Sequence, residues 1–269
     1  TLRDGTGNDF RDWQAAEERT GAVWLDAPAV HAAVASPFNY PAQTRVFIVN
    51  DVRKDDMAQV ASAYRELFLA SGGGALGLFT AIQRLREVHR RIGGAIDEAD
   101  LPLYAQHVDG LDLSTLIDIF RAEENACLLG TDAVRDGVDV PGSSLRLIVF
   151  DRVPWPRPDI LYKARRAAFG GGGYTDMLTR LKLKQAFGRL VRRADDRGVF
   201  VLLDPMMPTR LLGAFPDGVE VRRCGLAEAV AETRGFFGTA PVPTPSVDAD
   251  GTFRRNASSL SLSMTGSAA

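Results

Sequence analysis

Short, mostly apolar runs alternate with longer amphipathic stretches along most of this chain. The run at 145–150 ends in Leu-Ile-Val-Phe and lacks polar alternation, as expected of a strand covered on both faces. We predict strands at 22–26, 46–49, 76–80, 102–106, 126–130, 145–150 and 199–203. We predict helices at 8–19, 57–70, 83–92, 113–123, 178–192 and 226–236. This alternation favours an α/β domain in which helices flank a parallel sheet.

The composition changes at both ends of the alternating region. Residues 1–45 are a largely polar lead-in, and residues 46–237 carry the pattern that predicts the folded domain. Residues 238–269 are rich in Pro, Ser, Thr and Ala and have no apolar periodicity. Such a segment buries too little apolar surface to fold, so we predict a disordered tail.

The most informative motif lies at residues 185–198, which fit Q-x-x-G-R-x-x-R-x-x-x-D-x-G. If this segment is helical, the spacing places Gln185, Arg189 and Arg192 on one face. Two guanidinium groups and an amide on one face can bind an anion, because arginine presents a fixed fork of donors that fits phosphate oxygens. Gly188 leaves room for another backbone or a nucleotide beside Arg189.

A second motif lies upstream, where Leu-Leu-Gly-Thr-Asp at 128–132 precedes Gly-Val-Asp-Val-Pro-Gly at 137–142. A polar turn at the carboxyl end of a buried strand is where open α/β sheets bind ligands. Thr131, Gly137 and Asp139 are the candidate residues here. An ordinary turn would account for the glycines and for Asp139, but not for the Gln-Arg-Arg motif downstream.

A third, weaker pattern lies at residues 75–92, where an apolar run is followed by Thr80 and then by a basic amphipathic stretch that includes Arg84. The pattern indicates a strand, a turn and a helix. A threonine at the start of a helix can cap its free N–H groups or share them with a phosphate.

Together these segments resemble motifs VI, V and IV of superfamily-two helicases of the DinG and XPD branch, and the resemblance extends from Thr1 to about Phe237. It implies a RecA-like parallel sheet, the second motor domain of these enzymes. Two positions depart from the family pattern. Met206 stands where a basic residue is expected, and Arg135-Asp136 replaces an aromatic–acidic pair.

The resemblance also implies roles for the motif residues in ATP hydrolysis. Arg189 and Arg192 act as arginine fingers on the γ-phosphate, and Gln185 senses that phosphate or orients the surroundings of the attacking water. Gly137 and Asp139 line the ATP cleft. The expected activity is that of an ATP-dependent DNA helicase.

For the nucleic acid, the resemblance assigns Thr80, Thr131 and Arg84 to the backbone of a single strand, on a surface opposite the ATP cleft. The expected substrate is single-stranded or forked DNA, unwound from 5′ to 3′. This polarity comes from the family alone.

Half of the expected ATP site is missing from the sequence. No G-x-x-x-x-G-K-[ST] loop occurs, and no acidic D-E-x-H or D-E-x-D box follows a strand. Thr1-Leu2 resembles the end of a Ser-Ala-Thr-Leu run that closes the first motor domain in this family. We therefore expect a longer protein whose amino-terminal motor domain binds most of the ATP and Mg²⁺ and, in many relatives, an iron–sulfur cluster. The fragment alone is expected to be inactive.

The overall charge does not single out a nucleic-acid-binding protein. Hydrophobic residues make up 45% of the chain and charged residues 25%, and the formal net charge is −2. Basic residues are concentrated locally, at Lys163, Arg165, Arg166, Arg180, Lys182, Lys184, Arg189, Arg192, Arg193 and Arg197. A basic stripe on a near-neutral protein fits phosphate contacts, although a solvated face without a ligand has the same composition.

Cysteine use and hydropathy indicate the compartment. Cys127 and Cys224 have no C-x-x-C spacing, and the three histidines are scattered, so we predict neither a disulfide framework nor a metal site. A reducing compartment, the cytoplasm, is expected. No apolar stretch reaches the ~18 residues that span a bilayer, and we expect no membrane partner.

Two alternatives stay open at this stage. One is a catalytically inactive, nucleic-acid-binding remnant of a helicase, in which the motif residues are only structural. The other is an unrelated α/β enzyme that binds a dinucleotide or nucleotide sugar, because residues 72–77 fit G-x-G-x-x-G. These glycines precede a predicted strand instead of following one, so a helix C-cap and a turn fit them better.

Overall fold

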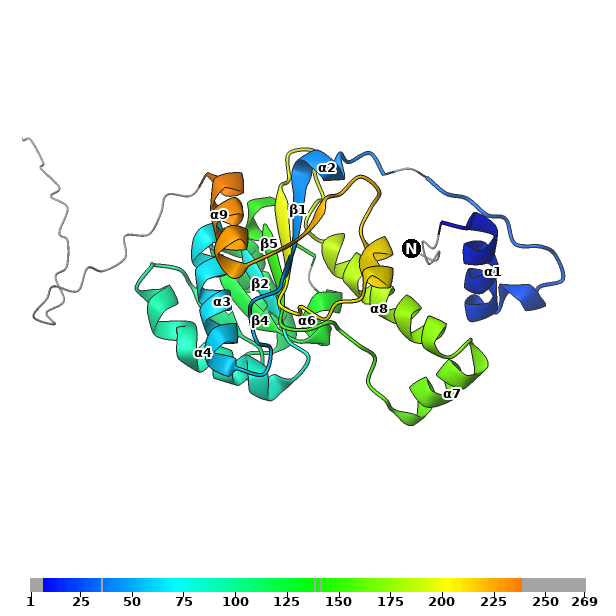
Figure 1. Ribbon diagram of the computed structural model, residues 1–269, viewed down its shortest axis with the longest axis horizontal. Coiled ribbons are helices and arrows are strands. Elements are labelled where there is room, and N and C mark those ends of the chain that lie inside the picture. The colour runs from blue at the N-terminus through cyan, green and yellow to red at the C-terminus, as the bar shows by residue number, and fades with distance from the viewer. Residues whose placement is uncertain (1–6, 35, 138, 141, 239–269) are drawn as a thin grey trace, which may run out of the picture. The chain divides into compact units, whose positions relative to one another are not determined.

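Seven short strands form one parallel sheet in the computed structural model, which describes residues 7–34, 36–137, 139–140 and 142–238 (Figure 1). The strand order is β3-β4-β2-β5-β6-β1-β7, and every neighbouring pair is parallel. The strands are β1 (Thr44–Val49), β2 (Ala75–Leu78), β3 (Leu103–Ala105), β4 (Cys127–Gly130), β5 (Leu147–Phe150), β6 (Gly198–Leu202) and β7 (Val221–Cys224). The predicted parallel α/β sheet is confirmed.

Helices cover both faces of this sheet. One face carries α3 (Met57–Ser71), α4 (Ile82–Asp97) and α9 (Leu226–Phe237). The other face carries α5 (Leu113–Ala122), α6 (Asp132–Gly137), α8 (Gly172–Phe187) and the 3-10 helix η3 (Thr209–Ala214). The remaining elements are α1 (Asp9–Thr20), η1 (Ala22–Trp24), α2 (Tyr40–Gln43), η2 (Gly142–Ser144) and α7 (Ile160–Ala168).

The central strands divide the apolar core into two layers. In β1, Phe47 and Val49 pack under α3 and α9, whereas Val46 and Ile48 pack against the other helical layer. This division follows from the period of two along a strand. All residues of β2, β4, β5 and β6 are buried, which explains why their sequences show no polar alternation.

The glycine run at 72–74 ends α3 and turns the chain into β2. Gly72 is the C-cap, with φ 66°, a left-handed conformation in which glycine avoids Cβ strain. The run lies after a helix and before a strand, so it cannot cradle a pyrophosphate at a helix start as a dinucleotide loop does. The interpretation as a helix C-cap and turn is confirmed.

Several predicted elements differ from the structure. Residues 22–24 form a 3-10 helix instead of a strand, and the helix predicted at 178–192 begins at Gly172 and ends at Phe187. The pattern also missed α6, α7 and the edge strand β7. In β7 the arginines hide the strand signal, because Arg222 forms ion pairs with Glu228 and Glu232 along α9 instead of packing into the core.

The first strand and the last helix of the sheet domain are well defined. Strand β1 begins at Thr44, and α9 ends at Phe237 with Gly238 as its C-cap. The predicted disordered tail, residues 238–269, lies outside the described residues except for Gly238. None of the described helices is long and apolar enough to span a bilayer.

Candidate functional site

The loop between α8 and β6, residues 188–197, carries the two arginines of the Gln-Arg-Arg motif, and we call it the arginine loop. Gln185 lies in the last turn of α8, which ends at Phe187. Tight turns follow, in which the N–H of Arg189 donates to the carbonyl of Ala186 at 3.0 Å. The prediction that all three motif side chains share one helical face is therefore wrong. Glycine at 188 weakens the helix, and β6 begins at 198, so the chain must turn in between.

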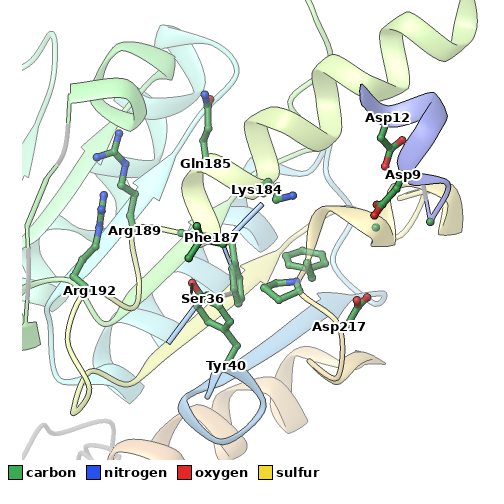
Figure 2. Close-up of a pocket in the computed structure, with 16 residues that line it drawn as sticks. Asp9, Asp12, Ser36, Tyr40, Lys184, Gln185, Phe187, Arg189, Arg192 and Asp217 are labelled. Carbon is green, nitrogen blue, oxygen red and sulfur yellow. Dashed lines mark hydrogen bonds between the residues drawn. The ribbon is translucent and has the colours of Figure 1, made fainter. Parts of the chain in front are cut away.

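The two arginines nevertheless meet the second motif. Arg192 Nη2 lies 3.2 Å from Asp139 Oδ1, and Arg189 Nη1 lies 3.9 Å from the same oxygen. Arg189 also donates from Nη2 to the carbonyl of Asp136 at 3.1 Å. Figure 2 shows Arg189 and Arg192 side by side, next to the end of α8 that bears Gln185. Residues far apart in the sequence thus form one cluster, which we call the arginine–Asp139 cluster.

The cluster has the properties of an anion site. The side chain of Asp139 is 68% exposed and so is easily displaced, whereas that of Arg189 is only 22% exposed. Burial, followed by the charge of Arg192, lowers the pKa of Arg189. Arginine stays protonated even so. Because the guanidinium groups of Arg189 and Arg192 meet at one exposed carboxylate, a second anion near them would be attracted by both.

The short helix α6 precedes Asp139 in the chain and helps to position the arginine–Asp139 cluster. The side chain of Arg135 is only 5% exposed and pairs with Asp132 at 2.8 Å and with Asp136 at 2.9 Å. Lys182 on α8 pairs with Asp132 as well, at 3.0 Å. The two Arg135 ion pairs lie within α6, at the positions where the family has an aromatic–acidic pair, and the Lys182–Asp132 pair joins α6 to α8. Gly137 ends α6, and a Cβ there would lie 3.1 Å from Ile117 Cδ1.

A cavity of about 760 Å³ opens beside the arginines (Figure 2). It is lined by Tyr40, Lys184, Gln185, Phe187, Arg189, Arg192, Phe215 and Asp217, together with Asp9 and Asp12 of α1 and neighbouring residues. Cationic and amide side chains form part of the wall, and aromatic rings form another part. This combination suits a ligand that has both phosphate groups and a flat apolar part.

At the carboxyl ends of β2 and β5, a buried carboxylate organises two of the predicted DNA contacts. Asp151 is fully buried and accepts hydrogen bonds from the N–H of Thr80 at 3.1 Å and from Arg84 Nε at 2.6 Å. Burial raises the pKa of Asp151, although Arg84 acts in the opposite direction. Arg84 Nη2 is buried without a hydrogen-bond partner in the described part of the chain. Thr80 does not cap α4, whose N-cap is Ala81.

Thr131 is similarly engaged inside the protein. Its hydroxyl donates to Gln106 Oε1 at 2.9 Å, and its N–H donates to the same oxygen at 3.0 Å. The residue is only 8% exposed. Sequence reasoning missed both Gln106, the last residue of the predicted strand 102–106, and Asp151, which directly follows the predicted strand 145–150, although polar residues of parallel sheets gather at such strand ends. Among the three predicted DNA contacts, Thr80 and Arg84 are half-buried and Thr131 is buried.

The predicted DNA contacts and the arginine–Asp139 cluster lie at opposite ends of the strands. Thr80 and Thr131 follow the carboxyl ends of β2 and β4. The arginine loop leads into the amino end of β6, and Arg121, which precedes β4, donates to the carbonyl of Asp139 at 3.3 Å. A ligand at the arginine–Asp139 cluster therefore does not compete with one at Thr80.

The described residues hold no group of three or more His, Cys, Asp and Glu side chains that could bind a metal ion. Cys127 and Cys224 are both buried, on separate strands of the sheet. Burial raises the pKa of Cys127 to about 12. A thiol of this kind is a core residue instead of a metal ligand.

The sequence matches the helicase C-terminal domain family over residues 64–220. It is 39% identical over 165 residues to the ATP-dependent helicase DinG of Mycobacterium tuberculosis, an alignment that covers 59% of this chain and 24% of that protein. It is 30% identical over 190 residues to the ATP-dependent DNA helicase YoaA of Escherichia coli, covering 66% of this chain and 29% of that protein. The chain thus spans about a quarter of the length of these relatives.

Solved structures support the same fold. An XPD helicase superimposes with a TM-score of 0.51 at 17% identity, covering 67% of this chain and 35% of that one. The parallel sheet with helices on both faces is accordingly the RecA-like fold of helicase motor domains. With the family match over residues 64–220, it follows that the chain belongs to the helicase C-terminal domain family, in its DinG/XPD-type branch of superfamily two.

Proposed function

We propose that this chain is the second motor domain of an ATP-dependent DNA helicase and supplies the arginine fingers for ATP hydrolysis. The observation that supports this most is the arginine–Asp139 cluster, in which two guanidinium groups share one exposed carboxylate. A γ-phosphate carries more negative charge than Asp139 and offers several acceptor oxygens to the same donors. ATP and Mg²⁺ are held mainly by a first motor domain, which this sequence does not contain.

In this proposal the two arginines act on charge that develops during hydrolysis. The γ-phosphoryl group passes through a transition state in which charge spreads over its oxygens, and guanidinium groups already in place stabilise that charge. Gln185, exposed at the end of α8, orients the surroundings of the attacking water. Asp139 and Gly137 line the cleft, and Asp139 releases the arginines when the nucleotide enters.

Nucleic acid would bind at the carboxyl ends of the strands, away from the arginine–Asp139 cluster. Thr80 offers its hydroxyl there, whereas Arg84 and Thr131 face Asp151 and Gln106. We infer that the latter two shape the DNA-binding turns, and that they contact the strand directly only if these internal bonds open. Closing and opening of the ATP cleft then moves the two motor domains relative to each other along a single strand, from 5′ to 3′ as the family implies. A DNA-processing role fits a cytoplasmic protein.

This chain alone is expected to hydrolyse no ATP, because it contains only one wall of the site. Joined to the first motor domain in the complete protein, it is expected to support turnover that single-stranded DNA stimulates. Phosphate release measured with and without oligonucleotide checks both statements. Turnover by the chain alone would contradict the divided site. A complete protein that binds single strands but never hydrolyses ATP would instead establish the inactive remnant.

The unpaired arginines of α7 are expected to contribute to DNA affinity. Arg165 and Arg166 form no ion pair within the described ranges, and no residue of α7 is buried. Changing both to Gln should weaken binding of an oligonucleotide and reduce the slope of log K against log salt by about 1.4, because each contact with a single strand contributes about 0.7.

The matched control is the arginine pair of α4. Arg90 and Arg91 are both bonded to Glu87, at 2.7 and 2.6 Å. Their replacement by Gln should leave the salt slope nearly unchanged. Fluorescence anisotropy over a range of salt concentrations measures both variants. Equal slopes for the two double variants would remove α7 from the DNA-binding surface.

A further inference from the structure

The arginine loop has no helix or strand of its own, so side chains must fix its shape. Asp196 supplies the first constraint. Its Oδ2 atom accepts hydrogen bonds from the N–H of Arg192 at 2.6 Å and of Arg193 at 2.7 Å. The residue is only 7% exposed. The carboxylate therefore fixes the backbone on which the Arg192 side chain is mounted.

Gln43 supplies the second constraint, from a distant part of the sequence. Its Nε2 atom lies within hydrogen-bond distance of three carbonyl oxygens of the loop, 3.0 Å from Ala194, 3.0 Å from Asp196 and 3.3 Å from Arg193. Asp196 thus binds N–H groups of the loop, and Gln43 binds carbonyl groups of the same turn. The amide is suited to this task because it carries two N–H donors.

The helix that carries Gln43 also contacts α8. Tyr40, at the start of α2, packs its ring 5.8 Å from that of Phe187, the last residue of α8. The Thr44 hydroxyl donates to the carbonyl of Tyr40 at 2.7 Å and secures α2 to β1. Helix α2 therefore contacts the polypeptide on both sides of Arg189: at Phe187 before it, and at residues 193–196 after it.

We propose that Gln43 is a positioning residue for the arginine fingers and transmits the placement of the lead-in segment to them. This inference rests on the proposed function of Arg189 and Arg192. Gln43 touches neither nucleotide nor reacting atoms in this scheme. It acts through the backbone carbonyls of the arginine loop, so that movement of α2 moves the two guanidinium groups relative to the γ-phosphate. Small displacements matter, because misplacing a catalytic group by about 1 Å can cost on the order of a hundredfold in rate.

The test uses Gln43→Ala and Gln43→Glu in the complete protein. Gln43→Ala removes the donors and is expected to lower kcat about tenfold, with the KM for ATP within about twofold of the original. Gln43→Glu should be slower still, because a carboxylate would face three carbonyl oxygens. Gln59→Ala is the control. This half-buried glutamine on α3 accepts a hydrogen bond from the N–H of Arg53, far from the arginine loop.

A binding measurement separates positioning from general stabilisation of the fold. Gln43→Ala should keep its affinity for ADP and lose about tenfold in affinity for ADP with aluminium fluoride, which mimics the transferring phosphoryl group. A kcat equal to that of Gln59→Ala overturns the proposal, as does a parallel loss of ADP affinity and thermal stability. If Arg192→Ala retains full turnover, the proposed arginine-finger role is wrong, and the positioning role of Gln43 falls with it. If Arg192→Ala is inactive while Gln43→Ala is unaffected, only the positioning role of Gln43 fails.

Discussion

Replacement of Arg192 by Ala in the complete protein is expected to reduce ATP turnover by ~10³-fold or more, the range seen when arginine fingers are removed from nucleotide hydrolases. Affinity for ATP should change little, because in the proposed scheme a first motor domain holds the phosphates and Mg²⁺. The guanidinium of Arg192 lies 3.2 Å from Asp139 in this structure, and its contribution appears when charge develops on the γ-phosphate. Steady-state kinetics with single-stranded DNA, together with equilibrium ATP binding, measure the two quantities separately.

Arg193→Ala is the matched control for this experiment. Arg193 is the next residue of the same loop and is exposed, but its side chain takes no part in the arginine–Asp139 cluster. Its backbone bonds to Asp196 and Gln43 do not depend on the side chain. The variant should therefore keep turnover within about threefold, since most substitutions at exposed positions have small effects. Full DNA-stimulated turnover in Arg192→Ala would remove the arginine from catalysis.

Gly73→Ala is expected to produce the largest loss of stability, about 3 kcal/mol or more from the free energy of unfolding. Gly73 has φ 89°, where an L-residue is strained by about 1–3 kcal/mol. A Cβ atom would also lie 2.0 Å from the carbonyl oxygen of Asn125, so backbone must move to admit it. Urea denaturation followed by circular dichroism gives the difference.

Gly93→Ala provides the opposite expectation in the same fold. Gly93 lies inside α4, and a Cβ there meets nothing within 4 Å. Alanine restricts the unfolded chain and favours the helix, so this variant should gain about 0.5–1 kcal/mol. If both variants changed stability by the same amount, the close approach of Gly73 to Asn125 would be wrong.

The fold could be predicted largely from the apolar runs of the central strands. These strands are covered on both faces, and continuous burial leaves a continuous apolar signature. The edge strand β7 was not predicted, because Arg222 and Arg223 interrupt its apolar pattern. Arg222 pairs with Glu228, and Arg223 donates a hydrogen bond to the carbonyl of Met207. Helix α7 was not predicted either, because none of its residues is buried and it has no apolar face that packs against the core.

The motif residues of the site were predicted, but not their local geometry. Spacing alone placed Gln185, Arg189 and Arg192 on one helix, whereas α8 stops before the two arginines. Helical periodicity does not locate this end, and the loop beyond it is held partly by Gln43, a residue distant in the sequence. Gln106, the partner of Thr131, was missed because it lies 25 residues away, after a different strand.

The most direct test of the divided ATP site is a structure of the complete protein with Mg²⁺ and a non-hydrolysable ATP analogue. We expect the guanidinium groups of Arg189 and Arg192 to lie within hydrogen-bond distance of γ-phosphate oxygens, about 2.7–3.2 Å, with Asp139 withdrawn. The phosphate loop of the other motor domain should hold the β-phosphate on the opposite side. A bound nucleotide whose γ-phosphate is remote from both arginines, with Arg192 still paired to Asp139, would contradict the account.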